Sequence, residues 1–205
     1  MLDLNDPQFI ELVTKGIPLT ELEARLRPCF KEDDYYKELA LHGGFGDYSG
    51  EGFIGYKEDL LQLVHKDWEL LEEYNLNHRV IADKIERLIS RGSTKESIFR
   101  LFGMGLLKKG YTYSEPSFQT MGTQPCPWEC EIRGQNVGMI FDKTLSDEER
   151  VKAEFGEENT SSGRYVLLTE LSPHLIREHY FFEGRDSPFR MDPLFLIKAF
   201  GLGKK

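Results

Sequence analysis

The chain has 205 residues, 40% of them hydrophobic, and its 26 basic and 35 acidic side chains give a formal net charge of −9, a composition typical of a globular protein with a sizeable core. Acidic side chains outnumber basic ones in both halves, which disfavours nucleic acid as a partner, because phosphate contacts need clustered Lys and Arg. No apolar segment is long enough to span a membrane and the N-terminus lacks a signal-peptide pattern, so we expect a cytoplasmic protein without membrane contact.

Residues 1–110 are expected to form a mainly helical region. Asp6, which precedes a proline, predicts the start of a first helix, and Gly16 predicts its end. Thr20 and Glu23 have the spacing of a capping box, which predicts a second short helix.

Two longer helices are predicted in the same region, over 56–75 and 77–92. Apolar residues recur at helical spacing in both segments, Asn77 is a favourable cap for the second, and Gly92 marks its end. Because the connection between them is very short, we expect an antiparallel helix pair.

Residues 111–205 change in character and predict an α+β region. Segments rich in aromatic and β-branched residues predict strands, and capping residues followed by glycines predict helices between and after them. The strands are expected at 111–122, 136–143 and 163–171, and the helices at 146–156, 172–184 and 192–201. The fold class is therefore α+β, with a mainly helical N-terminal half and a small antiparallel C-terminal sheet plus helices; whether 1–110 and 111–205 form one compact domain is left open.

Four residues of the second region have the types and spacing of metal ligands. Three residues separate Cys126 from Cys130, and four separate His174 from His179. This is the ligand set and local spacing of a tetrahedral Cys2His2 zinc site, and at these positions the sequence resembles the zinc-finger class. The resemblance implies a structural zinc ion bound by Cys126, Cys130, His174 and His179.

The chain departs from a zinc finger in the distance between the two ligand pairs. A finger has about 12 residues there, whereas 43 residues lie between Cys130 and His174. We therefore expect the zinc to clasp a larger fold. Two histidines five positions apart lie about 140° apart around an ideal helix, so both rings can reach one metal only if the last turn loosens.

Other interpretations of these residues are less favoured. The histidines could simply pack on an apolar helix, and the cysteines could form a redox dithiol, although the usual redox spacing is Cys-x-x-Cys. The segment around Glu178 is one residue longer than the H-x-x-E-H metalloprotease motif, and four protein ligands leave no position for a catalytic water. We therefore expect a structural metal, with Glu178 as a solvated charge near Arg177.

A glycine-rich segment at 42–55 contains the pattern G-x-G-x-x-G. No buried strand precedes it, so the dinucleotide-binding interpretation is disfavoured, and a flexible or tightly turned functional loop is expected instead. An acid–base set could be assembled around this loop, although the spacing does not require it, from His42, Asp47, Glu51 and His65.

Further along the chain, Arg185 and Arg190 lie among turn residues and aromatics. They could form a small lip that binds an anion or a partner. We favour the simpler expectation that Arg185 pairs with Asp186 or Glu183.

The sequence thus favours a zinc-stabilised cytoplasmic binding or regulatory module with a protein partner. The alternative is a metal-assisted or hydrolytic enzyme whose site lies near the glycine-rich loop at 43–55 or at an incompletely filled zinc shell. Nucleic-acid binding by analogy with zinc fingers is less favoured because the chain is acidic.

Overall fold

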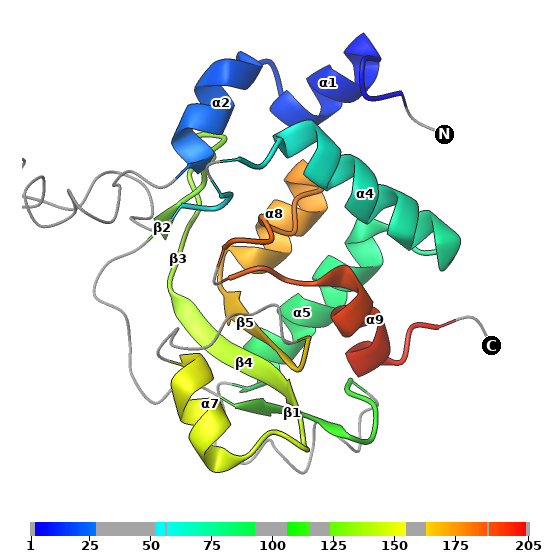
Figure 1. Ribbon diagram of the computed structural model, residues 1–205, viewed down its shortest axis with the longest axis vertical. Helices are drawn as coiled ribbons and strands as arrows, with labels where there is room; N and C mark the ends of the chain where they lie inside the picture. The colour runs from blue at the N-terminus through cyan, green and yellow to red at the C-terminus, as the bar shows by residue number, and fades with distance from the viewer. Residues whose placement is uncertain are drawn as a thin grey trace, which may run out of the picture.

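The computed structural model shows an α+β protein with a small antiparallel sheet, which confirms the predicted fold class (Figure 1). The structure describes residues 3–27, 52–55, 57–92, 106–114, 124–154, 163–187 and 189–203. Within this part, none of the helices combines the length and the apolar character that a membrane span requires.

Helix α1, Pro7–Thr14, begins and ends as the sequence predicts. The carboxylate of Asp6 accepts a hydrogen bond from the amide of Gln8 at 2.8 Å, which satisfies one of the free amides of the first turn. At the other end, Lys15 and Gly16 both have positive φ, which stops the helix.

Helix α2, Leu19–Leu26, starts differently from the prediction. It begins after Pro18, so Thr20 lies inside the helix and the expected capping box is wrong. The carboxylate of Glu23 instead accepts a hydrogen bond from the amide of Leu60 at 3.1 Å. The same carboxylate also pairs with Arg27 at 3.2 Å, and its bond to Leu60, a residue far along the chain, links α2 to the start of α4.

Helices α4, Leu60–Glu73, and α5, His78–Gly92, correspond to the two long predicted helices. Asp59 and Asn77 cap them by accepting hydrogen bonds from amides three residues ahead, at 2.8 and 3.1 Å. The expected pairing of these two helices is wrong, because α5 makes its most extensive helix contact with α8, Ser172–His179. The apolar face of α5 belongs to the same buried cluster as Ile176 of α8, and this shared burial outweighs the short connection to α4.

The main sheet has three antiparallel strands in the order β1-β4-β5. They are β1, Tyr111–Ser114, β4, Asn136–Asp142, and β5, Tyr165–Thr169. Helix α7, Asp147–Glu154, lies in the connection between β4 and β5. Its capping box is as predicted, since Ser146 donates its amide to the Glu149 carboxylate at 2.7 Å and accepts from the Glu149 amide at 3.2 Å.

Of the two C-terminal helices, α9 ends where the sequence predicts and α8 does not. Helix α9, Pro193–Phe200, begins at Asp192 and ends at Gly201, as predicted. Helix α8 ends at His179, five residues before the expected Gly184, because Tyr180 adopts a left-handed conformation with φ of 58°. A tyrosine rarely adopts this conformation, so the sequence did not predict this end.

Two buried clusters fill most of the interior, and each contains residues from both sides of position 110. The sheet cluster includes Ile81, Ile85, Leu88, Tyr113, Ile140, Val166, Leu168, Ile176, Phe182 and Phe195. The metal-side cluster includes Phe9, Val13, Leu22, Leu26, Val64, Cys126, Trp128, Leu171, Leu175 and Phe181. The division into 1–110 and 111–205 stays a prediction.

Figure 1 shows how the two clusters are arranged in space. Helices α1 and α2 form one end of the molecule, the sheet and α7 form the other, and α8 lies between them. Helix α8 contributes residues to both clusters, so its side chains are fixed from two directions.

Candidate metal centre

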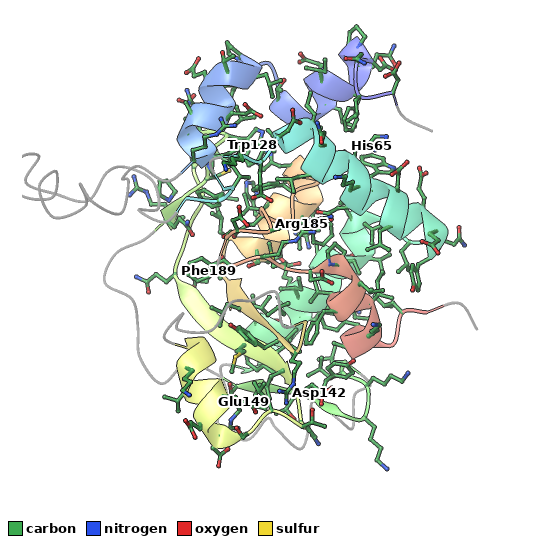
Figure 2. All side chains as sticks on the ribbon, in the orientation of Figure 1. His65, Trp128, Asp142, Glu149, Arg185 and Phe189 are labelled. Atoms are coloured by element: carbon green, nitrogen blue, oxygen red, sulfur yellow. The ribbon has the colours of Figure 1, made fainter. Side chains whose placement is uncertain are left out.

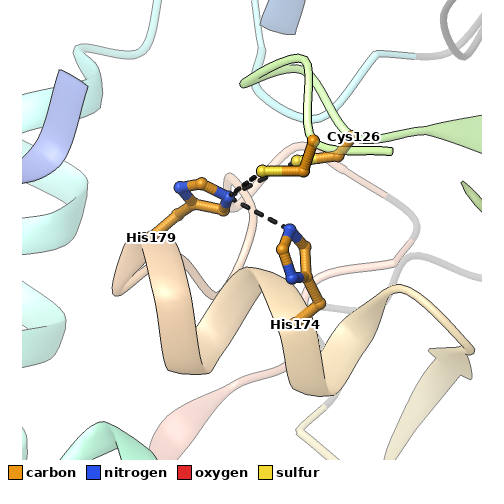
Figure 3. A group of neighbouring side chains, drawn as sticks. Cys126, His174 and His179 are labelled. Carbon is orange, nitrogen blue, oxygen red and sulfur yellow. Dashed lines mark hydrogen bonds between the residues drawn. The ribbon is translucent and has the colours of Figure 1, made fainter. Parts of the chain in front are cut away.

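The four predicted ligands converge in the structure. The candidate ligand atoms of Cys126, Cys130, His174 and His179 all lie within 4.8 Å of one another, a group that could hold a metal ion. The Nε2 atom of His179 lies 3.4 Å from each of the two sulfur atoms and 3.2 Å from Nε2 of His174 (Figure 3).

The two cysteines come together because the chain between them makes a tight turn. The amide of Glu129 donates to the carbonyl of Cys126 at 3.0 Å, and Glu129 has a φ of 61°. The amide of Cys126 donates to the carbonyl of Ile132 at 3.1 Å, which closes the turn behind Cys130. Both sulfur atoms are therefore presented on the same side of the turn.

A short hairpin that the sequence did not predict carries this turn. Strand β2, Gln124–Pro125, pairs with strand β3, Arg133–Gly134. A Cβ added at Gly134 would lie 2.5 Å from the backbone nitrogen of Leu171, the residue before α8. Only glycine permits so close an approach of the hairpin to Leu171. This approach places the cysteine turn against the start of α8.

Helix α8 presents His174 from its first turn and His179 from its last. At its end, the amide of Tyr180 bonds the carbonyl of Leu175, five residues back instead of four. The last turn is therefore wider than a regular α-helical turn. This is the loosening that the five-residue spacing requires if both rings are to face one point.

Trp128, between the two cysteines, orients His179 in a way that sequence reasoning missed. Its ring stacks on the imidazole of His179 with centroids 4.2 Å apart and planes 11° apart. Its Nε1 donates to the carbonyl of Val13 at 2.8 Å, which ties the cysteine turn to α1. Nδ1 of His179 is buried and has no hydrogen-bond partner among the described residues, so packing fixes the orientation of this ring.

Arg25 ties the same turn to α2. Its guanidinium donates to the carbonyl of Pro127 at 3.3 Å and pairs with Glu129 at 2.9 Å. The cysteine turn thus contacts α1, α2 and α8, all of which lie far from the turn in the sequence. Figure 2 shows Trp128 toward the α1–α2 end of the molecule, with Asp142 and Glu149 at the opposite end.

Burial sets the protonation of the four residues. It lowers the pKa of His179 to about 3, with further lowering from His174 and Lys15, and it also lowers the pKa of His174. Burial raises the pKa of the Cys126 thiol to about 12, and the neighbouring Cys130 adds to this rise. Neutral imidazoles are the form that binds metals, and a divalent cation deprotonates a coordinating thiol.

Only one member of the acid–base set considered from the sequence, His65, lies in the described part of the chain, so the set stays a prediction. Nδ1 of His65 lies 3.5 Å from Glu69 on the same helix, and its ring meets the edge of Phe9. Three further candidates, His42, Asp47 and Glu51, lie outside the described residues.

The described part of the glycine-rich segment, Gly52–Gly55, is packed against the protein. Phe53 and Ile54 are buried, and their amides donate to the carbonyl of Leu26 at 2.6 and 3.1 Å. The amide of Gly55 donates to the carboxylate of Glu58 at 2.7 Å. These amides are therefore used within the fold, and the rest of the segment, 42–51, lies outside the described residues.

The two arginines after α8 have roles that the sequence did not predict. Arg185 forms no ion pair with Asp186 or Glu183 in the described part of the chain; instead its backbone amide donates to the Glu58 carboxylate at 2.8 Å. Arg190 is buried and forms a two-bond ion pair with Asp67 of α4, at 2.5 and 2.7 Å. No local sequence pattern indicates this pair, because its members are 123 positions apart.

Glu178 is exposed, as predicted, and its neighbour Arg177 forms ion pairs with another helix. Arg177 pairs with Asp83 at 2.8 Å and with Glu86 at 2.7 Å, both on α5. These ion pairs hold α8 against α5.

Comparison of the chain with protein-family models, with curated proteins and with solved structures gives no match. The likeness to a zinc finger therefore rests on the four residues and their geometry alone.

Proposed function

We propose that Cys126, Cys130, His174 and His179 bind one structural zinc ion. The observation that carries the proposal is the crowding around Nε2 of His179, which has three polar neighbours at 3.2–3.4 Å. A neutral imidazole nitrogen makes one hydrogen bond, as donor or as acceptor, so hydrogen bonding accounts for only one of these neighbours. A cation at the centre of the group accounts for all three.

The distances from Nε2 of His179 agree with tetrahedral zinc. Bonds of about 2.3 Å to sulfur and 2.0–2.1 Å to nitrogen place a sulfur and a nitrogen about 3.5 Å apart, and two nitrogens about 3.3 Å apart. The corresponding separations are 3.4 Å and 3.2 Å. Two thiolates and two imidazoles are also a ligand set typical of zinc, and the two thiolates neutralise its charge.

The zinc would act as a clasp. It would join the cysteine turn, which contacts α1 and α2, to α8, which packs on α5. Four protein ligands leave no position for a catalytic water, so this shell favours stability over catalysis.

At the molecular level we propose a cytoplasmic binding or regulatory module that is stabilised by zinc and acts on a protein partner. The closed ligand shell argues against the hydrolytic alternative at this centre. The net charge of −9 argues against nucleic acid.

Metal analysis tests the proposal directly. Protein purified without a metal-affinity tag is expected to contain about one zinc per chain, and replacement by Co²⁺ should give the absorption of a tetrahedral thiolate complex. Cys126→Ser and His179→Ala should lose the metal and lower the Tm. His65→Ala is the matched control, because His65 lies outside the cluster and should keep the zinc content unchanged.

Two results would contradict the proposal in different ways. If the purified protein contains no zinc and its Tm does not change with a chelator, the four residues do not bind a metal. If Cys126→Ser folds normally but loses a hydrolytic activity that the wild-type protein has, the centre is catalytic and not structural.

A further inference from the structure

A cavity of about 620 Å³ lies beside the candidate metal centre. This volume is within the range of about 300–1,000 Å³ that is usual for binding pockets. Cys130, His174 and His179 contribute to its wall, so one side of the ligand group forms part of the cavity surface.

The cavity offers an apolar surface to a ligand. Trp128, Pro173 and Ile132 line it. The side chain of Ile132 is 42% exposed, and only one other large hydrophobic residue in the described part of the chain is as exposed as this. An exposed aliphatic side chain beside a buried tryptophan is a surface that can bind another aliphatic group.

Charged side chains of both signs line the cavity. Its lining contains three glutamates and two cations, and they are Glu86, Glu170, Glu178, Lys15 and Arg177. The guanidinium of Arg177 is already bound by two carboxylates of α5, and the ammonium group of Lys15 lies 5.6 Å from the centre of the Tyr180 ring.

Glu170 and Glu178 differ from Glu86, whose carboxylate is bound by Arg177. Both side chains are exposed, and neither forms an ion pair with any residue that the structure describes. The cavity lining therefore combines apolar side chains with two carboxylates that are available to an incoming cation.

We propose that this cavity binds a short segment of a protein partner in which an aliphatic side chain lies beside Lys or Arg. The aliphatic group would contact Trp128, Pro173 and Ile132, and the cation would lie near Glu170 and Glu178. The inference rests on the proposed binding function and specifies the chemistry of the partner. A nucleic-acid backbone would bring phosphates against these carboxylates and is disfavoured for that reason.

Fluorescence of Trp128 provides the test. Trp68→Phe leaves Trp128 as the single tryptophan, since the chain has two. The probes are two blocked peptides, Lys-Leu-Lys-Leu-Lys and Glu-Leu-Glu-Leu-Glu, together with a thymidine oligonucleotide. We expect a saturable, salt-sensitive change with the lysine peptide, and neither the glutamate peptide nor the oligonucleotide should compete for the site.

Matched variants locate the binding site. The double charge reversal Glu170→Lys with Glu178→Lys should weaken binding of the lysine peptide by about tenfold or more, and Ile132→Asp should also weaken it. Glu73→Lys on α4 is the control, because Glu73 is equally exposed but lies away from the cavity lining. Three results would overturn the inference. They are equal effects of the cavity charge reversals and of Glu73→Lys, equal binding of both peptides, and competition by the oligonucleotide.

Zinc content, measured on the same samples, separates this inference from the zinc proposal. A chain that contains zinc but gives no saturable change with the lysine peptide contradicts the cavity inference alone. A chain that lacks zinc but binds the peptide in the manner described contradicts the zinc proposal alone. The charge-reversal variants should retain one zinc per chain, so that weaker binding reports on the cavity.

Discussion

At the scale of single residues, Glu183 is a buried carboxyl group whose surroundings alter its protonation. Its side chain is fully buried, and burial raises its pKa from 4.5 to about 8. The hydroxyl of Ser187 donates to Oε2 at 2.6 Å, whereas Oε1 has no partner among the described residues. The guanidinium of Arg190, which is bound to Asp67, donates to the backbone carbonyl of Glu183.

Glu183→Gln should therefore change how stability depends on pH. Because the folded pKa is the higher one, the wild-type side chain contributes fully below pH about 4.5, and this contribution is lost as pH rises toward about 8. The loss in the wild type should approach roughly 1.4 kcal/mol per pH unit across this window, and the variant should lack it. Urea unfolding of both proteins between pH 5 and 8 measures the difference, and parallel profiles would contradict this assignment.

At the scale of elements, the approach of the β2–β3 hairpin to α8 determines whether the four ligands meet. Gly134→Ala would place a methyl group 2.5 Å from the nitrogen and 2.9 Å from Cβ of Leu171. We expect a destabilisation of about 1–3 kcal/mol from this overlap, together with weaker retention of zinc.

Gly203→Ala is the matched control for this substitution. A Cβ at Gly203 meets no described atom within 4 Å, so stability and zinc content should not change. Thermal unfolding and metal analysis of the two variants make the comparison. An unchanged Tm for Gly134→Ala would show that the hairpin can move away from α8 at little cost.

At the scale of the whole molecule, the metal-side cluster and the sheet cluster predict an uneven response to metal removal. Cys126 and Trp128 belong to the metal-side cluster together with residues of α1 and α2, whereas β4 and β5 contribute to the sheet cluster. A chelator should therefore increase hydrogen exchange in α1, α2 and the cysteine turn more than in β4 and β5. Exchange measured by mass spectrometry tests this, and an equal increase in all elements would mean that the clasp stabilises the fold uniformly.

Much of the fold was predictable where the signal lies within a few residues. The caps at Asp6, Asn77, Ser146 and Asp192 are local hydrogen bonds between near neighbours, and the structure contains them all. The capping box at Thr20 was wrong because Glu23 bonds a residue of another helix. The end of α8 was missed because Tyr180, a residue that rarely adopts positive φ, is held there by packing against Trp68 and His78.

The candidate ligands follow from the sequence alone, because the kinds of residue and their short spacings are properties of the chain. The α+β class follows in the same way, from the change from helical to strand-like patterns. The folded protein was needed to show that the two pairs converge across 43 intervening residues, that Trp128 orients His179, and that a cavity adjoins the cluster. These features depend on contacts between distant segments, and such contacts are selected by burial of the shared clusters and are not encoded in local sequence patterns.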